Sequence, residues 1–197
     1  MIDRTATISR KTSETDITIE LDLDGSRDIT VSTGVPFFDH MLNALAKHGR
    51  FGLSIDAVGD VEIDPHHTVE DVGIALGQAM KFALGDRAGI ERYGHAYAPL
   101  DEALARAVID CSGRPFLEFH AAFPEALIGQ DFAASLVEEF WRALVVNAGL
   151  TAHIDLLRAR NSHHAAEAIF KAGAVALRGA IRQTGDSYVP STKGVLA

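Results

Sequence analysis

The residues best suited to chemistry are two pairs of adjacent histidines, each followed by a glutamate. The pattern HHxxE occurs twice, at residues 66–70 and 163–167. On a helix, where each residue turns by about 100°, the first histidine and the glutamate share a face, while the two adjacent histidines point apart. One ion cannot easily bind both histidines of a pair, but two ions on either side of the helix can. A single such pair is more often a capped, solvent-exposed helix start, but two copies on matching helices favour metal binding.

An internal repeat adds two further candidate ligands. LSID at 53–56 matches AHID at 152–155, so Asp56 and Asp155 are equivalent. His40 lies 16 residues before Asp56, and Glu139 lies 16 residues before Asp155. Taken alone, His40 would be a core histidine and Glu139 a solvated helix residue, but Glu139 borders the apolar stripe of its helix. We therefore predict eight metal ligands: His40, His66, His67, Glu70, Glu139, His163, His164 and Glu167.

This ligand set predicts two bound divalent ions. Eight ligands give four protein groups to each ion and leave two open positions if the coordination is octahedral. Imidazole nitrogens mixed with carboxylate oxygens favour Mn²⁺ or Fe²⁺, and Zn²⁺ also fits.

A second group of residues could bind an anion. The segment at 190–194 reads PSTKG and offers two hydroxyl groups and an amine suited to phosphate. Arg92 and Arg114 lie in loops beside glycines, where a guanidinium can contact phosphate through two hydrogen bonds. Lys171 lies four residues after Glu167, on the same helix face. His48 is a weaker candidate, since it ends a helix and can simply complement the helix dipole.

The elements that must position these residues follow the same repeat. Alternating apolar residues predict strand structure over 5–24, with Ile17, Ile19, Leu21 and Leu23 on one side, and a returning strand over 28–32. In the first half, a helix over 37–48 ended by Gly49, a strand over 53–58 and the first histidine helix over 66–84 follow. In the second half we expect strands at 102–110 and 116–122, a helix at 132–147 ended by Gly149, a strand at 150–156, and the second histidine helix at 163–182, capped at Asn161-Ser162.

The predicted fold class is α+β, with an internal duplication of a strand-strand-helix-strand-helix unit and sheets covered by helices. The halves are residues 1–92 and 93–197, packed as one compact globular unit. The boundary is expected in the segment 85–93, which is rich in glycine and charge.

Composition excludes several classes of function. The 197 residues are 47% hydrophobic, enough for a sizeable core, and the net charge of −9 comes without a basic block for nucleic acid or a membrane surface. Cys111 is the single cysteine, so no internal disulfide can form. The polar N-terminus does not have the apolar region of a signal peptide, and no apolar run approaches the roughly 18 residues of a membrane helix. We expect a soluble, cytoplasmic protein that binds neither nucleic acid nor membrane.

Several motifs together resemble the imidazoleglycerol-phosphate dehydratase family of histidine biosynthesis, over nearly the whole chain. They are FFDHML at 37–42, HHTVED at 66–71, SGRP at 112–115, NSHHAAEAIFKA at 161–172 and PSTKG at 190–194. The resemblance implies a fold of two related halves, similar to ribosomal protein S5 domain 2. It also implies two Mn²⁺ ions per active site and a large homo-oligomer, a cage of 24 copies, with active sites between subunits.

The resemblance also assigns roles to residues of this sequence. The family's metal ligands fall on the eight residues given above, although several relatives have histidine where this chain has Glu139; carboxylate can replace imidazole on Mn²⁺. The catalytic carboxylates would be Glu14, Glu70 and Glu167, with Glu14 as the acid/base group. The substrate-binding residues would be Glu14, His40, His48, His66, Asp71, Arg92, Arg114, Lys171, Ser191, Thr192 and Lys193.

The implied reaction removes water from imidazole glycerol phosphate and gives imidazole acetol phosphate. The proton that is lost is not next to a carbonyl, so the carbon is a poor acid. Two metals on the two ring nitrogens would hold the ring as an imidazolate that expels the adjacent hydroxyl. A base then removes the neighbouring proton, and remote phosphate binding fixes the chain.

Two other readings of the residues stay open at this point. One is a dinuclear metallohydrolase of the phosphatase kind, which needs metals roughly 4 Å apart, whereas divergent histidine pairs indicate a wider separation. The other is a non-enzymatic, metal-assembled protein, which would have no use for a phosphate-binding segment.

Overall fold

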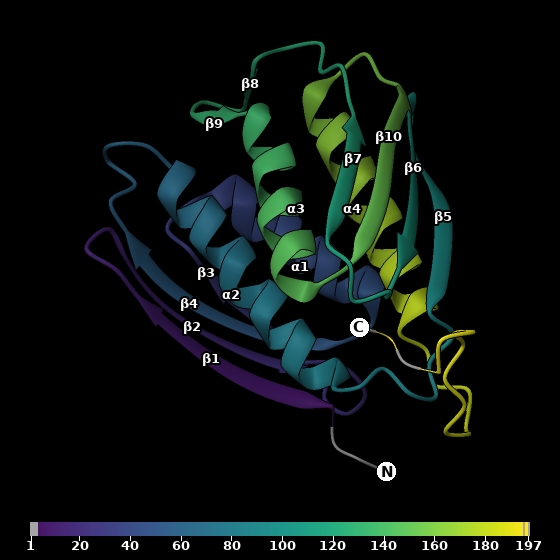
Figure 1. Ribbon diagram of the computed structural model, residues 1–197. Helices are drawn as coiled ribbons and strands as arrows, with labels where there is room; N and C mark the ends of the chain where they lie inside the picture. Colours follow the sequence, from purple (N-terminus) through teal and green to yellow (C-terminus); the bar gives the residue numbers. More distant parts are fainter. Residues whose placement is uncertain (1–3, 195, 197) are drawn as a thin grey trace.

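Four helices lie between two four-stranded sheets, so the molecule has three layers (Figure 1). The computed structural model describes residues 4–194 and 196. Residues 1–3 of the first predicted half, and residues 195 and 197 of the second, lie outside the described residues. The apolar faces of the sheets point inward. In the second strand, for example, Ile17, Ile19 and Leu21 are buried while the residues between them are exposed, as the alternation predicted.

The first half forms one sheet and two helices. In chain order the elements are β1 (Thr5–Lys11), β2 (Thr15–Asp22), β3 (Ile29–Ser32), α1 (Pro36–Gly49), β4 (Gly52–Gly59) and α2 (His66–Leu84). The strand order is β1-β2-β4-β3, antiparallel except for the β3–β4 pair.

The second half repeats this arrangement. Its elements are β5 (Tyr93–Leu100), β6 (Ala103–Asp110), β7 (Phe116–His120), the short β8 (Leu127–Ile128) and β9 (Phe132–Ala133), α3 (Ser135–Ala148), β10 (Thr151–Arg158) and α4 (Ser162–Ala180). The main sheet has the order β5-β6-β10-β7, again with one parallel pair, β7–β10. The α+β fold class is confirmed, and the first strand of this half, β5, begins at Tyr93.

The strand registers align the halves residue by residue. Asp56 in β4 pairs with Thr18 in β2, and the equivalent Asp155 in β10 pairs with Arg106 in β6. Thr18 and Arg106 therefore hold equivalent positions in the two sheets.

The repeated unit contains one strand more than predicted, at the start of each half. In the first half, the expected continuous stretch 5–24 is a hairpin that turns at residues 12–14. In the second half, β5 was missed because its buried face carries only small residues, Gly94, Ala96 and Ala98. A Cβ at Gly94 would lie 1.9 Å from the carbonyl oxygen of Ala176, so close packing of α4 requires this glycine.

Two helix boundaries also differ from the prediction. The helix expected from residue 132 begins at Ser135, because β9 occupies residues 132–133. Gly49 remains inside α1, and Arg50 adopts the left-handed conformation, φ 61°, that we expected of the glycine. A Cβ at Gly49 would lie 2.3 Å from the Phe51 ring, so tight packing explains this glycine. Gly149 does end α3 in the left-handed conformation, and the predicted cap at Asn161 accepts a hydrogen bond from the backbone N–H of His164.

Each histidine helix packs against a helix of the other half: α2 against α3, and α4 against α1. Glycines allow the α2–α3 approach, since a Cβ at Gly73 would lie 2.8 Å from the Cβ of Ala143. A Cβ at Gly77 would likewise lie 2.6 Å from the carbonyl oxygen of Leu144. This exchange of partners brings side chains of the two halves together. None of the described helices combines the length and the apolar character needed to cross a bilayer.

Candidate active site

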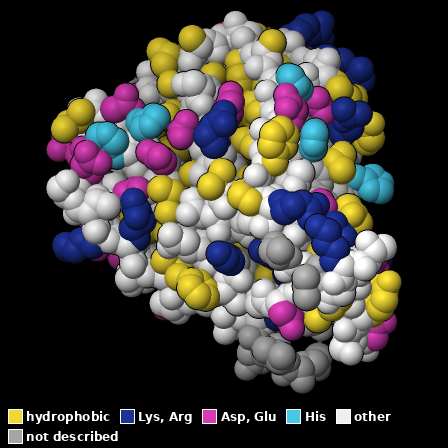
Figure 2. Space-filling view, in the orientation of Figure 1, with side chains coloured by type: hydrophobic (Ala, Val, Ile, Leu, Met, Phe, Trp, Pro, Cys, Tyr) yellow, Lys and Arg dark blue, Asp and Glu magenta, His cyan; other side chains and the backbone are white. Residues whose placement is uncertain are grey.

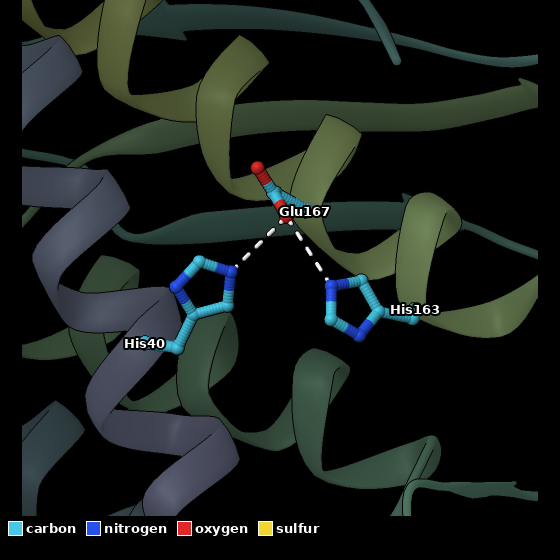
Figure 3. A group of neighbouring side chains, drawn as sticks. All are labelled: His40, His163 and Glu167. Carbon is cyan, nitrogen blue, oxygen red and sulfur yellow. Dashed lines mark hydrogen bonds and ion pairs between the residues drawn. The ribbon is translucent and has the colours of Figure 1, made fainter. Parts of the chain in front are cut away.

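The first group of candidate ligands joins the two halves at the α1–α4 contact. His40 comes from α1, and His163 and Glu167 come from the first turns of α4 (Figure 3). Glu167 Oε2 lies 3.1 Å from His40 Nε2 and 3.4 Å from His163 Nε2. We call these three residues the His40 cluster.

Two opposing effects, burial and the neighbouring Lys171, determine the charge of Glu167. Lys171 Nζ lies 2.6 Å from the other oxygen of Glu167, Oε1, so the two oxygens have separate partners. Burial raises the pKa of Glu167, but hydrogen bonds from Lys171 and His40 outweigh it and lower the pKa to about 2. The carboxylate is thus held ionised, with Oε2 directed at the two imidazoles, which are both about half exposed.

The second group lies at the α2–α3 contact and consists of His66, Glu70 and Glu139, which we call the His66 cluster. His66 Nε2 lies 3.8 Å from Glu70 Oε2 on α2, and Glu139 joins them from α3. The adjacent Glu138 instead pairs with Arg142 on the exposed face of its own helix. Of the two adjacent glutamates, the one that the internal repeat aligns with His40, Glu139, is therefore the one that faces the other half.

The donor set of each cluster fits a divalent metal ion. In each, one ligand atom per residue lies within 4.8 Å of the other two. Ligand atoms around one ion, at bonds of about 2.0–2.2 Å, lie within roughly 4.4 Å of each other, so small side-chain shifts would close either cluster around an ion. Two imidazoles with one carboxylate, and one imidazole with two carboxylates, are both mixed nitrogen and oxygen sets.

The second histidine of each pair points away from its cluster, as helical geometry predicted. The ring centroids within each pair lie 6.1 Å apart, and among the described residues neither His67 nor His164 belongs to a group of candidate ligands. His67 Nδ1 lies 3.0 Å from Asp60 Oδ2, and His164 Nδ1 lies 2.8 Å from Glu102 Oε2. With Nδ1 bound, each ring presents Nε2 as its remaining ligand atom.

These acidic partners change the pKa values of both histidines and of one glutamate. The hydrogen bond with Asp60 raises the pKa of His67, and the hydrogen bond with Glu102 raises the pKa of His164. In return, the His164 hydrogen bond lowers the pKa of Glu102 to about 2. Glu14 also faces His67, with Oε2 at 3.9 Å from Nδ1, and its side chain is 50% exposed.

The residues predicted to bind phosphate line one hollow of about 500 Å³. It is bounded by Arg92, Arg114, two tyrosines and the segment from Pro190 to Lys193. Arg92 is nearly buried; its guanidinium donates to both carboxylate oxygens of Asp110 and to the carbonyl oxygen of Pro190, and the Asp110 hydrogen bond raises its pKa. Arg92 therefore holds the segment in place, whereas Arg114 is 61% exposed over the hollow.

Comparison with known proteins places this geometry in a family. The family model for imidazoleglycerol-phosphate dehydratase matches residues 33–177. The imidazoleglycerol-phosphate dehydratase of Thiobacillus denitrificans is 58% identical over 98% of this chain and 100% of its own length, and that of Halorhodospira halophila is 54% identical over the full length of both. The chain belongs to the imidazoleglycerol-phosphate dehydratase family.

Solved structures agree with this assignment. The crystal structure of imidazoleglycerol-phosphate dehydratase from Staphylococcus aureus superposes with a TM-score of 0.83 at 43% identity, covering 91% of this chain and 99% of that one. That of the Pyrococcus furiosus protein, in complex with (S)-C348, gives 0.83 at 35% identity, covering 96% and 100%. The predicted family and function are confirmed: the chain is a dehydratase, and hence a lyase, of histidine biosynthesis. The hydrolase and non-enzymatic alternatives are set aside.

The geometry of this dehydratase separates the remaining predicted substrate residues. His48 lies near Lys171 and Glu167. Burial lowers the pKa of His48 most, and the positive charge of Lys171 lowers it further. Asp71 is instead buried, and its carboxylate accepts hydrogen bonds from Arg10 and Thr15. In this structure Asp71 ties α2 to the first hairpin, which is a structural role.

Three acidic residues that sequence reasoning missed contact the predicted site residues: Asp60, Glu102 and Asp110. Asp60 and Asp110 stand at or next to the ends of strands, and acids in such places are common. Glu102 lies four residues before Arg106, as Glu14 lies four residues before Thr18, but this match follows only from the strand registers of the structure.

Proposed function

We propose that this dehydratase depends on two divalent ions per active site, Mn²⁺ by preference with Fe²⁺ or Zn²⁺ also compatible, and that each active site is built from several copies of the chain. The resemblance suggests a cage of 24 copies. The substrate would be imidazole glycerol phosphate, in which a three-carbon chain joins the imidazole ring to the phosphate.

The observation that carries this proposal is the distance between the His40 cluster and the phosphate hollow. The backbone N–H of Arg92 donates to the carbonyl oxygen of Ala180, at the end of α4, while His163 stands at the start of the same helix. The 17 residue-to-residue steps from His163 to Ala180 rise roughly 26 Å along the helix. Figure 2 shows histidine and acidic side chains gathered mainly in the upper half of the view; lysine and arginine side chains lie both among them and in a group lower down.

A substrate with a three-carbon chain cannot reach from the His40 cluster to the hollow of the same chain. We infer that the hollow of one copy supplies phosphate binding to the clusters of another. The divergent histidines support the same arrangement. Within the described part of one chain, His67 and His164 do not join the three-residue clusters, and a neighbouring copy could bring one of them to each cluster as a fourth ligand.

The chain's own groups then divide the reaction. Ions held by the clusters would polarise the imidazole ring and ease the loss of the adjacent hydroxyl. Glu14 would take the proton from the next carbon, so that a hydroxyl and a proton leave as water and the resulting enol becomes a ketone. Arg114 and Lys193 would hold the phosphate, and Lys171 would keep Glu167 ionised.

Shared active sites can be tested by mixing two inactive variants. His40→Ala/His66→Ala breaks the clusters and leaves the divergent histidines, whereas His67→Ala/His164→Ala does the reverse. We expect each variant alone to be inactive, and a mixture reassembled from separated chains to regain a fraction of wild-type turnover, because some sites receive all their ligands. A mixture of His40→Ala/His66→Ala with Glu167→Ala, which share a broken cluster, is the control. Sites confined to one chain would regain nothing in either mixture.

Substitutions in the phosphate hollow should weaken substrate binding. A charge-assisted hydrogen bond contributes about 1.5–3 kcal/mol, so Arg114→Ala and Lys193→Ala should each raise KM about tenfold to a hundredfold. Inorganic phosphate should compete with substrate in the wild type. Arg182→Ala is the matched control, because Arg182 is exposed just beyond the end of α4 and pairs with Glu91 outside the hollow. An unchanged KM for Lys193→Ala would mean that the lysine is only solvated.

A further inference from the structure

The internal repeat gives Glu14 a counterpart in the second half. Thr18 and Arg106 are equivalent in the two sheets, and Glu14 and Glu102 each precede them by four residues. Both glutamates lie at the turn of the first hairpin of their half, between β1 and β2 or between β5 and β6. A register shift in the β6–β10 pair falls near the end of the ladder, past Leu156, and leaves the Arg106 pairing intact.

Both glutamates face the divergent histidine of their own half, but at different distances. Glu102 Oε2 lies 2.8 Å from His164 Nδ1, whereas Glu14 Oε2 lies 3.9 Å from His67 Nδ1. The side chain of Glu102 is 19% exposed and that of Glu14 is 50% exposed. Glu102 Oε1 also accepts the backbone N–H of Arg160, which fixes the carboxylate on the loop before α4.

Asp60 explains why Glu14 lies farther from its histidine than Glu102 does. In the first half His67 Nδ1 is bound by Asp60, which directly follows β4. The residue that directly follows β10 in the second half is Ala159, whose methyl group accepts no hydrogen bond. The second half thus lacks an aspartate at this position, and Glu102 occupies the place beside the histidine ring.

We propose that Glu102 is a positioning residue: it binds Nδ1–H of His164 and so presents Nε2 of that ring as a metal ligand, as Asp60 does for His67. Of the two equivalent glutamates, only Glu14 then remains available to substrate. A carboxylate on the second nitrogen of a ligating histidine fixes the ring orientation and raises its basicity as a ligand. The inference rests on the proposed metal dependence, which it deepens.

The test is a measurement of Mn²⁺ affinity rather than activity. The full-length protein is freed of metal and then titrated with Mn²⁺, whether or not its copies stay assembled without metal. Bound Mn²⁺ per chain is measured at each concentration of free Mn²⁺. Glu102→Ala should weaken binding at one class of site by about 10- to 100-fold, the usual effect of losing such a partner. Glu102→Gln keeps one acceptor oxygen, which can still accept the hydrogen bond from His164, and should lose less; it also guards against misfolding of the alanine variant.

Two controls separate positioning from proximity. Glu118→Ala removes another glutamate paired with a histidine, His120 at 2.9 Å, outside the HHxxE patterns, and should bind Mn²⁺ like the wild type. Glu14→Gln should also keep near-wild-type affinity, because Asp60 continues to hold His67. Wild-type affinity in Glu102→Ala would overturn the inference, as would an equal loss in Glu14→Gln. Failure of the wild type itself to bind Mn²⁺ would instead overturn the proposed function.

Discussion

Chelation of the bound metal should abolish dehydratase activity and reduce the size of the particle, and Mn²⁺ should restore both. If one ion takes ligands from two copies, its binding free energy is also assembly free energy, because separate copies bind it less well. Each cluster brings together three candidate ligands within the described part of one chain, and under the proposed function a neighbouring copy supplies a fourth. Activity and light scattering should therefore respond over the same range of free metal.

A dilution series in buffer without chelator is the control for this experiment, since it lowers chain concentration at constant metal. If light scattering showed an unchanged particle after complete metal removal, assembly would not be coupled to the ions. Loss of activity would still support metal dependence, so the two claims can fail separately.

Replacement of Glu14 by glutamine should lower kcat by about 100-fold or more while substrate and metal still bind. The variant keeps the size of the side chain but removes its capacity to transfer a proton, and general acid–base groups typically contribute 10²–10⁴-fold. The half-exposed position of Glu14 beside His67, without the close hydrogen bond that holds Glu102, fits a group that must meet a substrate.

Steady-state kinetics of Glu14→Gln should be compared with Glu20→Gln, since Glu20 is exposed on the next strand, β2. The control should retain the wild-type kcat. A near-normal kcat for Glu14→Gln would remove this residue from the chemistry and turn attention to the cluster carboxylates.

Helical geometry made most of the His40 and His66 clusters predictable. An i, i+4 spacing fixes His66 beside Glu70, and His163 beside Glu167, whatever surrounds the helix. The repeat then identified Glu139, although its neighbour Glu138 has the same chemistry. What the sequence could not supply was the exchange of helices, by which each cluster draws on both halves.

Other features escaped because they depend on tertiary packing. The buried face of strand β5 consists of glycine and alanine, which give only a weak hydrophobic pattern in the sequence. Asp71 stands in the HHTVED motif, yet Arg10 and Thr15 bind it on the buried side of α2. The Arg92 guanidinium donates hydrogen bonds to Asp110 and to the carbonyl oxygen of Pro190, which is 98 residues away in the chain. No local pattern reports such partners.

The exchange of helices has a consequence for the origin of the chain. An ancestral half-length protein would have carried one histidine helix and one partner helix, and two identical copies facing each other would have formed two identical clusters. Fusion of such copies into one gene would have allowed these twin clusters to change independently. The difference between His40 in one cluster and Glu139 in the other would be a result of such a divergence, as would the difference between Asp60 and Ala159 at the strand ends. Two clusters with different ligand sets can thus descend from two identical ones.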